Sequence, residues 1–244
     1  MSARFEGKTA VVTGASGDLG RLLCTALLDE GASVIGLDID ATRGEQMVEA
    51  GRAFTFRQLD VTDAAGVEAF GRACEPVDVL INAAGVISYA PMGETTVEEW
   101  DRVLGINVRG AFLVTKALEP VLREGGAVVN ISSSAAVRAG AGWSAYSTSK
   151  AGLVAFSKVA AAELAPGVRV NVVCPGALDT QMPHRLLDGH PAKDEVMTQM
   201  AQASMLGRLG EAAEVVPLCL FLASAEASLI TGASIAIDGG MTAW

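Results

Sequence analysis

The sequence is short of positive charge, and this shortage excludes one class of partner. Lysine and arginine number 18 against 28 aspartates and glutamates, which gives 244 residues a formal net charge of −10. Binding to nucleic acid or to an acidic membrane surface depends on basic side chains that neutralise phosphates. Neither is therefore an expected partner.

Cysteine and histidine are also scarce and badly placed for disulfides or metals. No CxxC pair occurs, which predicts free thiols in a reducing compartment. His184 and His190 lack the spacing of metal ligands, so no metal site is expected. The four cysteines lie far apart, at Cys24, Cys74, Cys174 and Cys219.

Long hydrophobic runs are absent as well. Met1 to Lys8 carries charges and has no apolar segment of the kind found in signal peptides. The longest apolar stretch, Val215 to Ala223, is interrupted by Pro217 and is too short to cross a bilayer. These features predict a cytoplasmic protein.

What the sequence does contain is alternation. Half of the residues are hydrophobic and only 19% are charged, which fits an α/β sheet buried on both faces. Short β-branched runs alternate with helix-like segments, as in repeated β-α units. The expected strands are Thr9–Thr13, Ser33–Leu37, Phe54–Leu59, Val77–Asn82, Ala127–Ser132, Val168–Val173 and Ser234–Ile237. The expected helices are Leu19–Glu30, Ala64–Cys74, Val97–Leu122, Ala145–Leu164 and Glu211–Ala223.

This pattern predicts an α/β fold with a doubly wound, seven-stranded parallel sheet of Rossmann type and helices on both faces. No linker or repeat divides the chain, so residues 1–244 are expected to form a single domain. One irregular, Met-rich stretch at 181–206 is broken by Pro183, Gly189 and Pro191. Such an insertion is either a lid over a site or a decorative surface helix.

A glycine-rich turn, Thr13 to Gly20, follows the first expected strand and opens the first helix. Backbone N–H groups and the helix dipole can receive a pyrophosphate there. Gly14 permits a tight turn, and Gly20 permits close packing of helix on strand. Such turns also close βα units that bind nothing, so the turn needs support from its context.

The second strand is followed by Asp38, eighteen positions after Gly20. A carboxylate there can accept hydrogen bonds from an adenosine ribose and repels a 2′-phosphate, so NAD is preferred to NADP. Ile39, not an arginine, follows it. Asp38 is alternatively an ordinary turn residue before Asp40. Polar residues recur after the third and fourth strands, in Asp60-Val61 and in Asn82-Ala83-Ala84-Gly85.

A second cluster lies farther along the chain. Ser132, Ser133 and Ser134 follow the fifth strand, and Tyr146 and Lys150 lie four apart at the start of a helix. At this spacing an ammonium lies near the phenol and favours its ionised form. We expect Lys150 to lower the pKa of Tyr146 from about 10 toward the working range of a general acid or base. The same spacing also arises by chance, and the serines alone read as a polar turn.

The sequence resembles the short-chain dehydrogenase/reductase family over nearly its whole length. The matching segments are Thr13-Gly14 to Gly20, Asp60-Val61, Asn82 to Gly85, Asn107, Ser133, Tyr146 with Lys150, Pro175-Gly176, and Ile230-Thr231-Gly232 to Asp238-Gly239-Gly240.

The resemblance implies hydride transfer between a nicotinamide and a secondary alcohol or ketone. Tyr146 would be the general acid or base, and Ser133 would hold the substrate oxygen. Lys150 would bind the nicotinamide ribose, and Asn107 would support a water that links Lys150 to solvent. The expected NAD-binding residues are Gly14, Ser16, Gly17, Asp18, Leu19, Gly20, Asp38, Ile39, Asp60, Val61, Asn82, Ala83, Gly85, Tyr146, Lys150, Pro175, Gly176, Leu178 and Thr180.

Two residues depart from the family pattern. Asp18 replaces the usual glycine two positions before Gly20, and a carboxylate there would be repelled by a pyrophosphate, so we expect it to point to solvent. Ala83 replaces a commoner asparagine, which leaves the amide of Asn82 and is not expected to abolish binding.

The substrate is expected to be a small neutral or weakly polar alcohol or ketone. The wall around Ser133 and Tyr146 would include Ala135, Trp143, Met182 and His184, although Trp143 is equally well read as structural. A 3-oxoacyl-carrier-protein reductase using NADPH is the nearest alternative, and an inactive dinucleotide-binding sensor or scaffold is a second. The resemblance also implies a homotetramer or homodimer, with the expected helices 97–122 and 145–164 packed between subunits.

Overall fold

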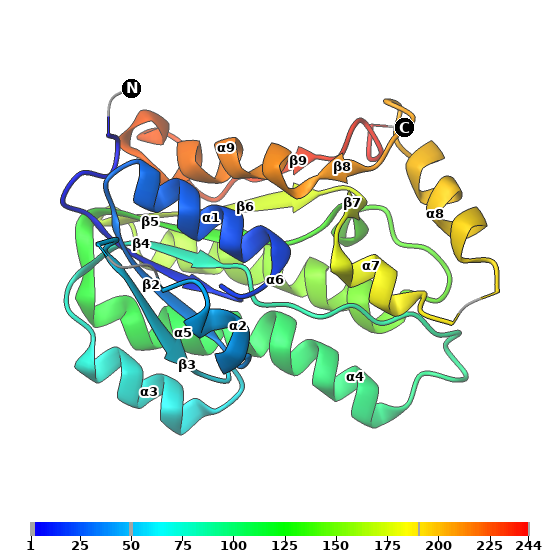
Figure 1. The fold of residues 1–244 in the computed structure, drawn as a ribbon, viewed down its shortest axis with the longest axis horizontal. Coiled ribbons are helices and arrows are strands. Elements are labelled where there is room, and N and C mark those ends of the chain that lie inside the picture. The colour runs from blue at the N-terminus through cyan, green and yellow to red at the C-terminus, as the bar shows by residue number, and fades with distance from the viewer. Residues whose placement is uncertain (1–2, 49–50, 190, 244) are drawn as a thin grey trace.

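The computed structural model describes residues 3–48, 51–189 and 191–243, so His190 lies outside the described residues. Its main sheet has the order β3-β2-β1-β4-β5-β6-β9, and every pairing is parallel (Figure 1). This confirms the predicted sheet. The strands are β1 (Thr9–Thr13), β2 (Ser33–Asp38), β3 (Phe54–Gln58), β4 (Val77–Asn82), β5 (Leu122–Ile131), β6 (Val168–Pro175) and β9 (Ser234–Ile237).

Helices cover both faces of this sheet. On one face α1 (Asp18–Asp29) packs beside α9 (Ala212–Ala223); on the other lie α3 (Ala64–Ala73), α4 (Val97–Leu104), α5 (Ala111–Leu118) and α6 (Ser144–Glu163). Alternate side chains of β4 serve the two cores: Val79 and Ile81 join the α1 and α9 side, and Leu80 the other. All of β4 is buried, as expected for a central parallel strand.

The expected helix 97–122 is helical from 97 to 121, but it is not an α-helix throughout. After α4 the chain forms a π-helical turn, η1 (Gly105–Gly110), before α5 begins, and a 3₁₀ turn at Glu119–Val121 leads into β5. The apolar spacing of a π turn differs little from that of an α-helix, so periodicity did not reveal it. Such turns often occur at functional sites.

The segment 181–206 contains two helices, α7 (Gln181–Leu186) and α8 (Lys193–Gln202). At its base β7 (Leu178–Asp179) pairs with β8 (Gly210–Glu211). These two-residue strands and the five-residue helix α2 (Ala41–Glu45) are too short to produce a periodic signal in the sequence, so they were not predicted.

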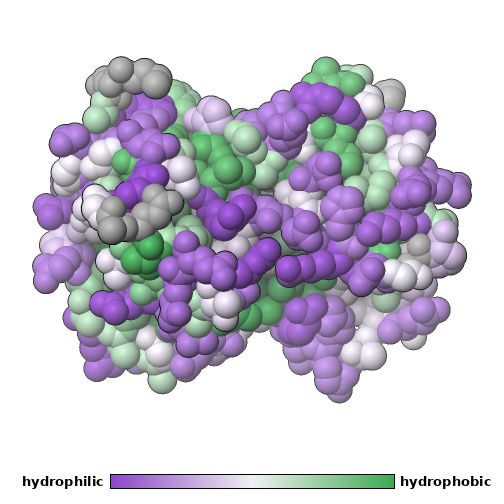
Figure 2. Space-filling view, in the orientation of Figure 1, coloured by the Kyte–Doolittle hydropathy of each residue, from purple (hydrophilic) through white to green (hydrophobic). Residues whose placement is uncertain are grey.

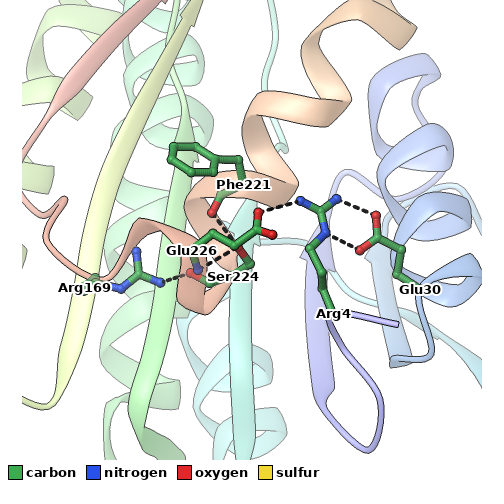
Figure 3. A network of polar contacts seen from close by, with 6 residues as sticks. All are labelled: Arg4, Glu30, Arg169, Phe221, Ser224 and Glu226. Carbon is green, nitrogen blue, oxygen red and sulfur yellow. Dashed lines mark hydrogen bonds and ion pairs between the residues drawn. The ribbon is translucent and has the colours of Figure 1, made fainter. Parts of the chain in front are cut away.

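A polar network ties the chain together at the amino ends of the strands (Figure 3). Arg4 bonds both carboxylate oxygens of Glu30, at the end of α1, and reaches Glu226 beyond α9. Arg169, at the start of β6, donates to the carbonyl oxygen of Ser224 at 2.8 Å. The network therefore joins the amino-terminal segment, α1, α9 and the sheet.

Within the described residues no helix is long and apolar enough to cross a membrane.

Candidate active site

A cavity of about 1420 Å³ lies at the carboxyl ends of the strands, where ligands bind in open α/β sheets. It extends from the ends of β1 and β2 to those of β5 and β6, and α7 borders it. Figure 2 shows the surface hollowed between the part that carries α1 and α2 and the part that carries α4 and α7. The volume exceeds the usual range of about 300–1,000 Å³ for small-ligand pockets, which leaves room for a large ligand together with a small one.

The glycine-rich turn is built for a close approach of backbone. Gly14 has φ +67°, and a Cβ on it would lie 2.7 Å from the nitrogen of Ala84. A Cβ on Gly20 would lie 2.0 Å from the oxygen of Gly14. The hydroxyl of Thr13 accepts hydrogen bonds from the nitrogens of Ala83 and Ala84, which ties β1 to the loop after β4. These contacts require glycine at both positions.

Asp38 is both a turn residue and part of the cavity wall. Its Oδ2 accepts a hydrogen bond from the nitrogen of Ser16 at 2.9 Å, and its Oδ1 from that of Asp40 at 3.0 Å. The two interpretations left open by the sequence are therefore compatible, because the backbone contacts fix the carboxylate at the cavity edge. Arg43 of α2 lines the same end and was missed.

Asn82 does not line the cavity, which departs from the sequence prediction. Its buried amide donates to Thr115 at 3.1 Å and to the side-chain oxygen of Asn130 at 2.8 Å. Among the described residues, its own Oδ1 has no partner. Asn82 therefore braces β4 against β5 and α5, beneath the cavity floor.

Tyr146 and Lys150 lie on one face of α6, as their spacing predicts. The Nζ of Lys150 lies 5.8 Å from the centre of the Tyr146 ring and donates to the oxygen of Ile131 at 3.0 Å. The hydroxyl of Ser132 donates to the Lys150 carbonyl at 2.9 Å. Tyr146, Lys150 and Ser133 all line the cavity. The end of β5 and the first turns of α6 are thus fixed together.

Burial governs the ionisation of this pair. It lowers the pKa of Lys150 from 10.5 to about 8, because an ammonium loses its hydration there. It also raises the pKa of Tyr146 above its ordinary value, and hydrogen bonding from Ser133 only partly opposes this. The predicted lowering of the Tyr146 pKa by Lys150 is therefore not found, because the effect of burial is the larger one.

Asn107 lies on η1, just behind the cavity wall. Its Oδ1 accepts from the nitrogen of Val86 at 2.8 Å, and its Nδ2 donates to the Val86 oxygen and to the hydroxyl of Ser149, each at 2.9 Å. Ser149 in turn donates to the carbonyl of Tyr146 at 2.7 Å. A Cβ on Gly85 would lie 3.3 Å from both Asn107 Oδ1 and Lys150 Nζ. The π turn thus fixes Asn107 against both the β4 loop and α6.

Comparison with known proteins places these features in a family. A family model described as "Enoyl-(Acyl carrier protein) reductase" matches residues 14–242. The chain is 37% identical to D-threitol dehydrogenase of Mycolicibacterium smegmatis, over 98% of this chain and 94% of the relative. It is 36% identical to cyclopentanol dehydrogenase of Comamonas, over 98% and 99%. The chain belongs to the short-chain dehydrogenase/reductase family.

Solved structures agree with this assignment. The ligand-free aldohexose dehydrogenase of Thermoplasma acidophilum matches with a TM-score of 0.89 and 30% identity, over 100% of this chain and 97% of that one. Among the relatives found by sequence, a 3-oxoacyl-carrier-protein reductase of Thermotoga maritima is 34% identical, over 98% of this chain and 99% of the relative. The comparisons therefore show an oxidoreductase of this family and leave its substrate open.

The residues of this family member fit a nicotinamide dinucleotide, the cofactor that the family binds. Gly17 precedes α1 without a side-chain cap, which leaves backbone N–H groups for an anion. The cavity reaches from Asp38 at one end to Lys150 at the other. Apart from Asn82, every residue predicted to bind the cofactor lines it.

Of the four residues predicted for the substrate wall, all but His184 line the cavity. Ala135, Trp143 and Met182 line the cavity, whereas His184 bonds the carboxylate of Asp179 at 2.8 Å outside the cavity lining. Trp143 fits both interpretations, that of a substrate-wall residue and that of a structural residue. It lines the cavity, and its ring also packs against that of Tyr146, with 5.9 Å between the ring centroids.

The C-terminal segment contributes to the site of this family member without any local signal in the sequence. Met241 lines the cavity, its carbonyl accepts from Arg138 at 2.7 Å, and its sulfur contacts the hydroxyl of Ser134. Arg138 and Arg185, both missed, also line the cavity. Only the fold brings residue 241 next to residues 134 and 138.

Asp18, which stands where the family usually has glycine, differs most from expectation. Its half-buried carboxylate does not point freely to solvent; Oδ2 accepts a hydrogen bond from the nitrogen of Gln181 at 2.6 Å. The glycine-rich turn and α7 are thus directly connected.

Proposed function

We propose that this enzyme transfers a hydride between NAD(H) and a neutral secondary alcohol or ketone. The observation that carries the proposal is the convergence of Tyr146, Ser133 and Lys150 on the wall of a cavity whose far end is edged by the Asp38 carboxylate. When bound, the nicotinamide supplies the hydride acceptor or donor.

The residues of the chain then transfer the proton and orient the substrate and the cofactor. Tyr146 takes the hydroxyl proton of the alcohol during oxidation and returns it during reduction. Ser133 orients the substrate oxygen beside that phenol. Lys150 has one acceptor, Ile131 O, among the described residues, so two of its three N–H groups are free for ribose hydroxyls. Asn107 positions η1 against α6 and supports a water next to Lys150.

NAD is the preferred cofactor because of Asp38. Two backbone N–H groups hold its carboxylate at the cavity edge, where it accepts hydrogen bonds from a ribose diol. A 2′-phosphate would meet a fixed negative charge there. Parallel assays with NAD and NADP test this directly, and a higher kcat/KM with NADP would contradict it.

The residues that line the cavity away from Asp38 indicate the substrate class. Ala135, Trp143, Met182 and Leu186 line the same cavity as the Tyr146 and Ser133 side chains and give it apolar and aromatic surface. The names of the relatives, which include D-threitol and cyclopentanol dehydrogenases, support small polyols or cyclic alcohols. The test is a panel of cyclic alcohols, polyols and hydroxy acids; strong activity only on the anionic compounds would refute a neutral substrate.

A 3-oxoacyl-carrier-protein reductase using NADPH is the second candidate. Arg43 favours it, because among the described residues its guanidinium has no hydrogen-bond partner and it lines the Asp38 end. The net charge of −10 disfavours docking of an acidic carrier protein. Faster turnover of a carrier-linked oxoacyl substrate with NADPH would reverse this order.

A dinucleotide-binding sensor without chemistry is the alternative from another class. Tyr146→Phe removes the proton-transferring oxygen and keeps the ring that packs on Trp143. An active parent beside an inactive, folded variant excludes the sensor, whereas an inactive parent that still binds NAD would establish it.

We further propose that residues 1–244 form one domain, with 181–206 as its lid, and that the chain assembles as a homotetramer or homodimer. Val97, Phe112 and Val159 support the assembly, since these apolar side chains are exposed on α4, α5 and α6. Light scattering distinguishes the two oligomers from a monomer.

A further inference from the structure

One contact between two residues that line the cavity is unexplained by the proposed chemistry. The carboxylate of Asp18, in the first turn of α1, lies 2.6 Å from the backbone nitrogen of Gln181, the first residue of α7. The two residues are 163 positions apart in sequence. In Figure 1, α7 lies beyond the amino-terminal end of α1.

The contact supplies what α7 lacks. The first N–H groups of any helix have no acceptor within the helix, and a side chain just before it commonly provides one. Here Thr180 precedes α7 without making a side-chain cap. Asp18 takes that place from another helix, and its negative charge suits the positive end of the α7 dipole.

The segment that begins at Gln181 forms part of the substrate wall. Met182, Arg185 and Leu186 of α7 line the cavity, and Asp18 lines it as well. Fixing the first turn of α7 therefore fixes the position of this wall relative to the glycine-rich turn. The same bond holds the Asp18 carboxylate against the first turn of α7.

We propose that Asp18 is a positioning residue that caps α7 and thereby orders the substrate wall. The proposal rests on the proposed function in one respect, which is that the part of the cavity lined by α7 binds the substrate. Glycine at this position would leave the first turn of α7 without its cap.

The first test needs neither cofactor nor substrate. Asp18→Ala removes the acceptor, and Asp18→Asn keeps one neutral oxygen in the same place. Glu98→Ala is the matched control, because Glu98 is an exposed carboxylate in the first turn of α4 and lies outside the cavity. Amide hydrogen exchange at Gln181 and tryptic cleavage after Arg185 are measured in the cofactor-free protein.

We expect exchange and cleavage to be about 5-fold faster in Asp18→Ala, as for the loss of one capping bond. Asp18→Asn should fall between Asp18→Ala and the parent, and Glu98→Ala should match the parent. Unchanged protection of Gln181 in Asp18→Ala, or an equal effect in Glu98→Ala, would overturn the proposal.

The second test is kinetic. In Asp18→Ala, measured with NAD at saturation, we expect the KM for the alcohol to rise about 5-fold with a much smaller change in kcat, since the wall binds substrate and does not transfer the proton. Partial recovery of KM in Asp18→Asn is the signature of the cap. A fall in kcat with KM unchanged would contradict positioning. Absence of nicotinamide-dependent activity in the parent would refute the proposed function and leave the exchange result to decide the cap.

Discussion

Replacing Lys150 by methionine removes a buried ammonium and keeps an unbranched side chain of similar length. Lys150 is 5% exposed, and burial lowers its pKa from 10.5 to about 8. At about 1.36 kcal/mol per pKa unit, holding this ammonium charged costs the folded protein about 3 kcal/mol at neutral pH. The carbonyl of Ile131 loses its side-chain donor in the variant, which costs about 1 kcal/mol. Lys150→Met should therefore stabilise the cofactor-free protein by about 2 kcal/mol while abolishing activity.

The effect has a defined pH dependence. Below pH 8 both folded and unfolded chains carry the proton, so the cost is constant. Between about pH 8 and 10.5 the unfolded chain binds more protons than the folded one, so the stability of the parent rises with pH. The difference between parent and Lys150→Met should therefore shrink across that window.

Thermal unfolding at pH 7 and at pH 10, at one protein concentration, measures both effects. The expected rise in Tm at pH 7 is about 4–8 °C for a chain of this size. Lys158→Met is the control, because Lys158 is an exposed lysine of the same helix and should leave Tm nearly unchanged. A Tm of Lys150→Met below that of the parent, or a gain that does not vary with pH, would refute the reasoning.

Three further predictions concern the proton, the cofactor and the amino edge of the sheet. Because burial raises the pKa of Tyr146 and oxidation needs its phenolate, kcat/KM for alcohol oxidation should rise from pH 7 to pH 10, while that for ketone reduction, which needs the protonated phenol, should stay nearly constant; a flat oxidation profile would contradict this. Asp38→Asn should raise the NADP-to-NAD ratio of kcat/KM by about 10-fold, because the fixed charge goes and Arg43 remains; an unchanged ratio would count against Asp38 as the selector. Arg169→Ala should lower stability to urea by about 2 kcal/mol with unchanged kcat, because two carbonyl oxygens at the end of α9, those of Leu222 and Ser224, lose their donor.

Several parts of the fold were predictable because they depend on local sequence. The strands β1 and β9 begin and end where the β-branched runs do, and α6 and α9 lie within a residue of their expected bounds. The π turn at 105–110 was not predictable, because it changes backbone hydrogen bonding without changing which residues are apolar. It is tertiary contact with Val86 and Ser149 that holds Asn107 there.

In the candidate site, too, some features were predictable from local sequence and others were not. Tyr146 and Lys150 share a helical face because four residues make about one turn, and Gly14 and Gly20 are needed wherever a strand turns this tightly into a helix. His184 was misplaced because a side chain on a short helix can face either way, and its bond to Asp179 decides the direction.

The sequence by itself determined the parallel sheet, the glycine-rich turn and the order of the polar groups that meet at its carboxyl edge. These follow from periodicity and spacing, which act over a few residues. The tertiary structure alone decided that the Tyr146 pKa is raised, that Met241 lines the cavity and that Asp18 contacts the first residue of α7. Each of these depends on burial or on a contact between residues far apart in the chain, and no local pattern records such a contact.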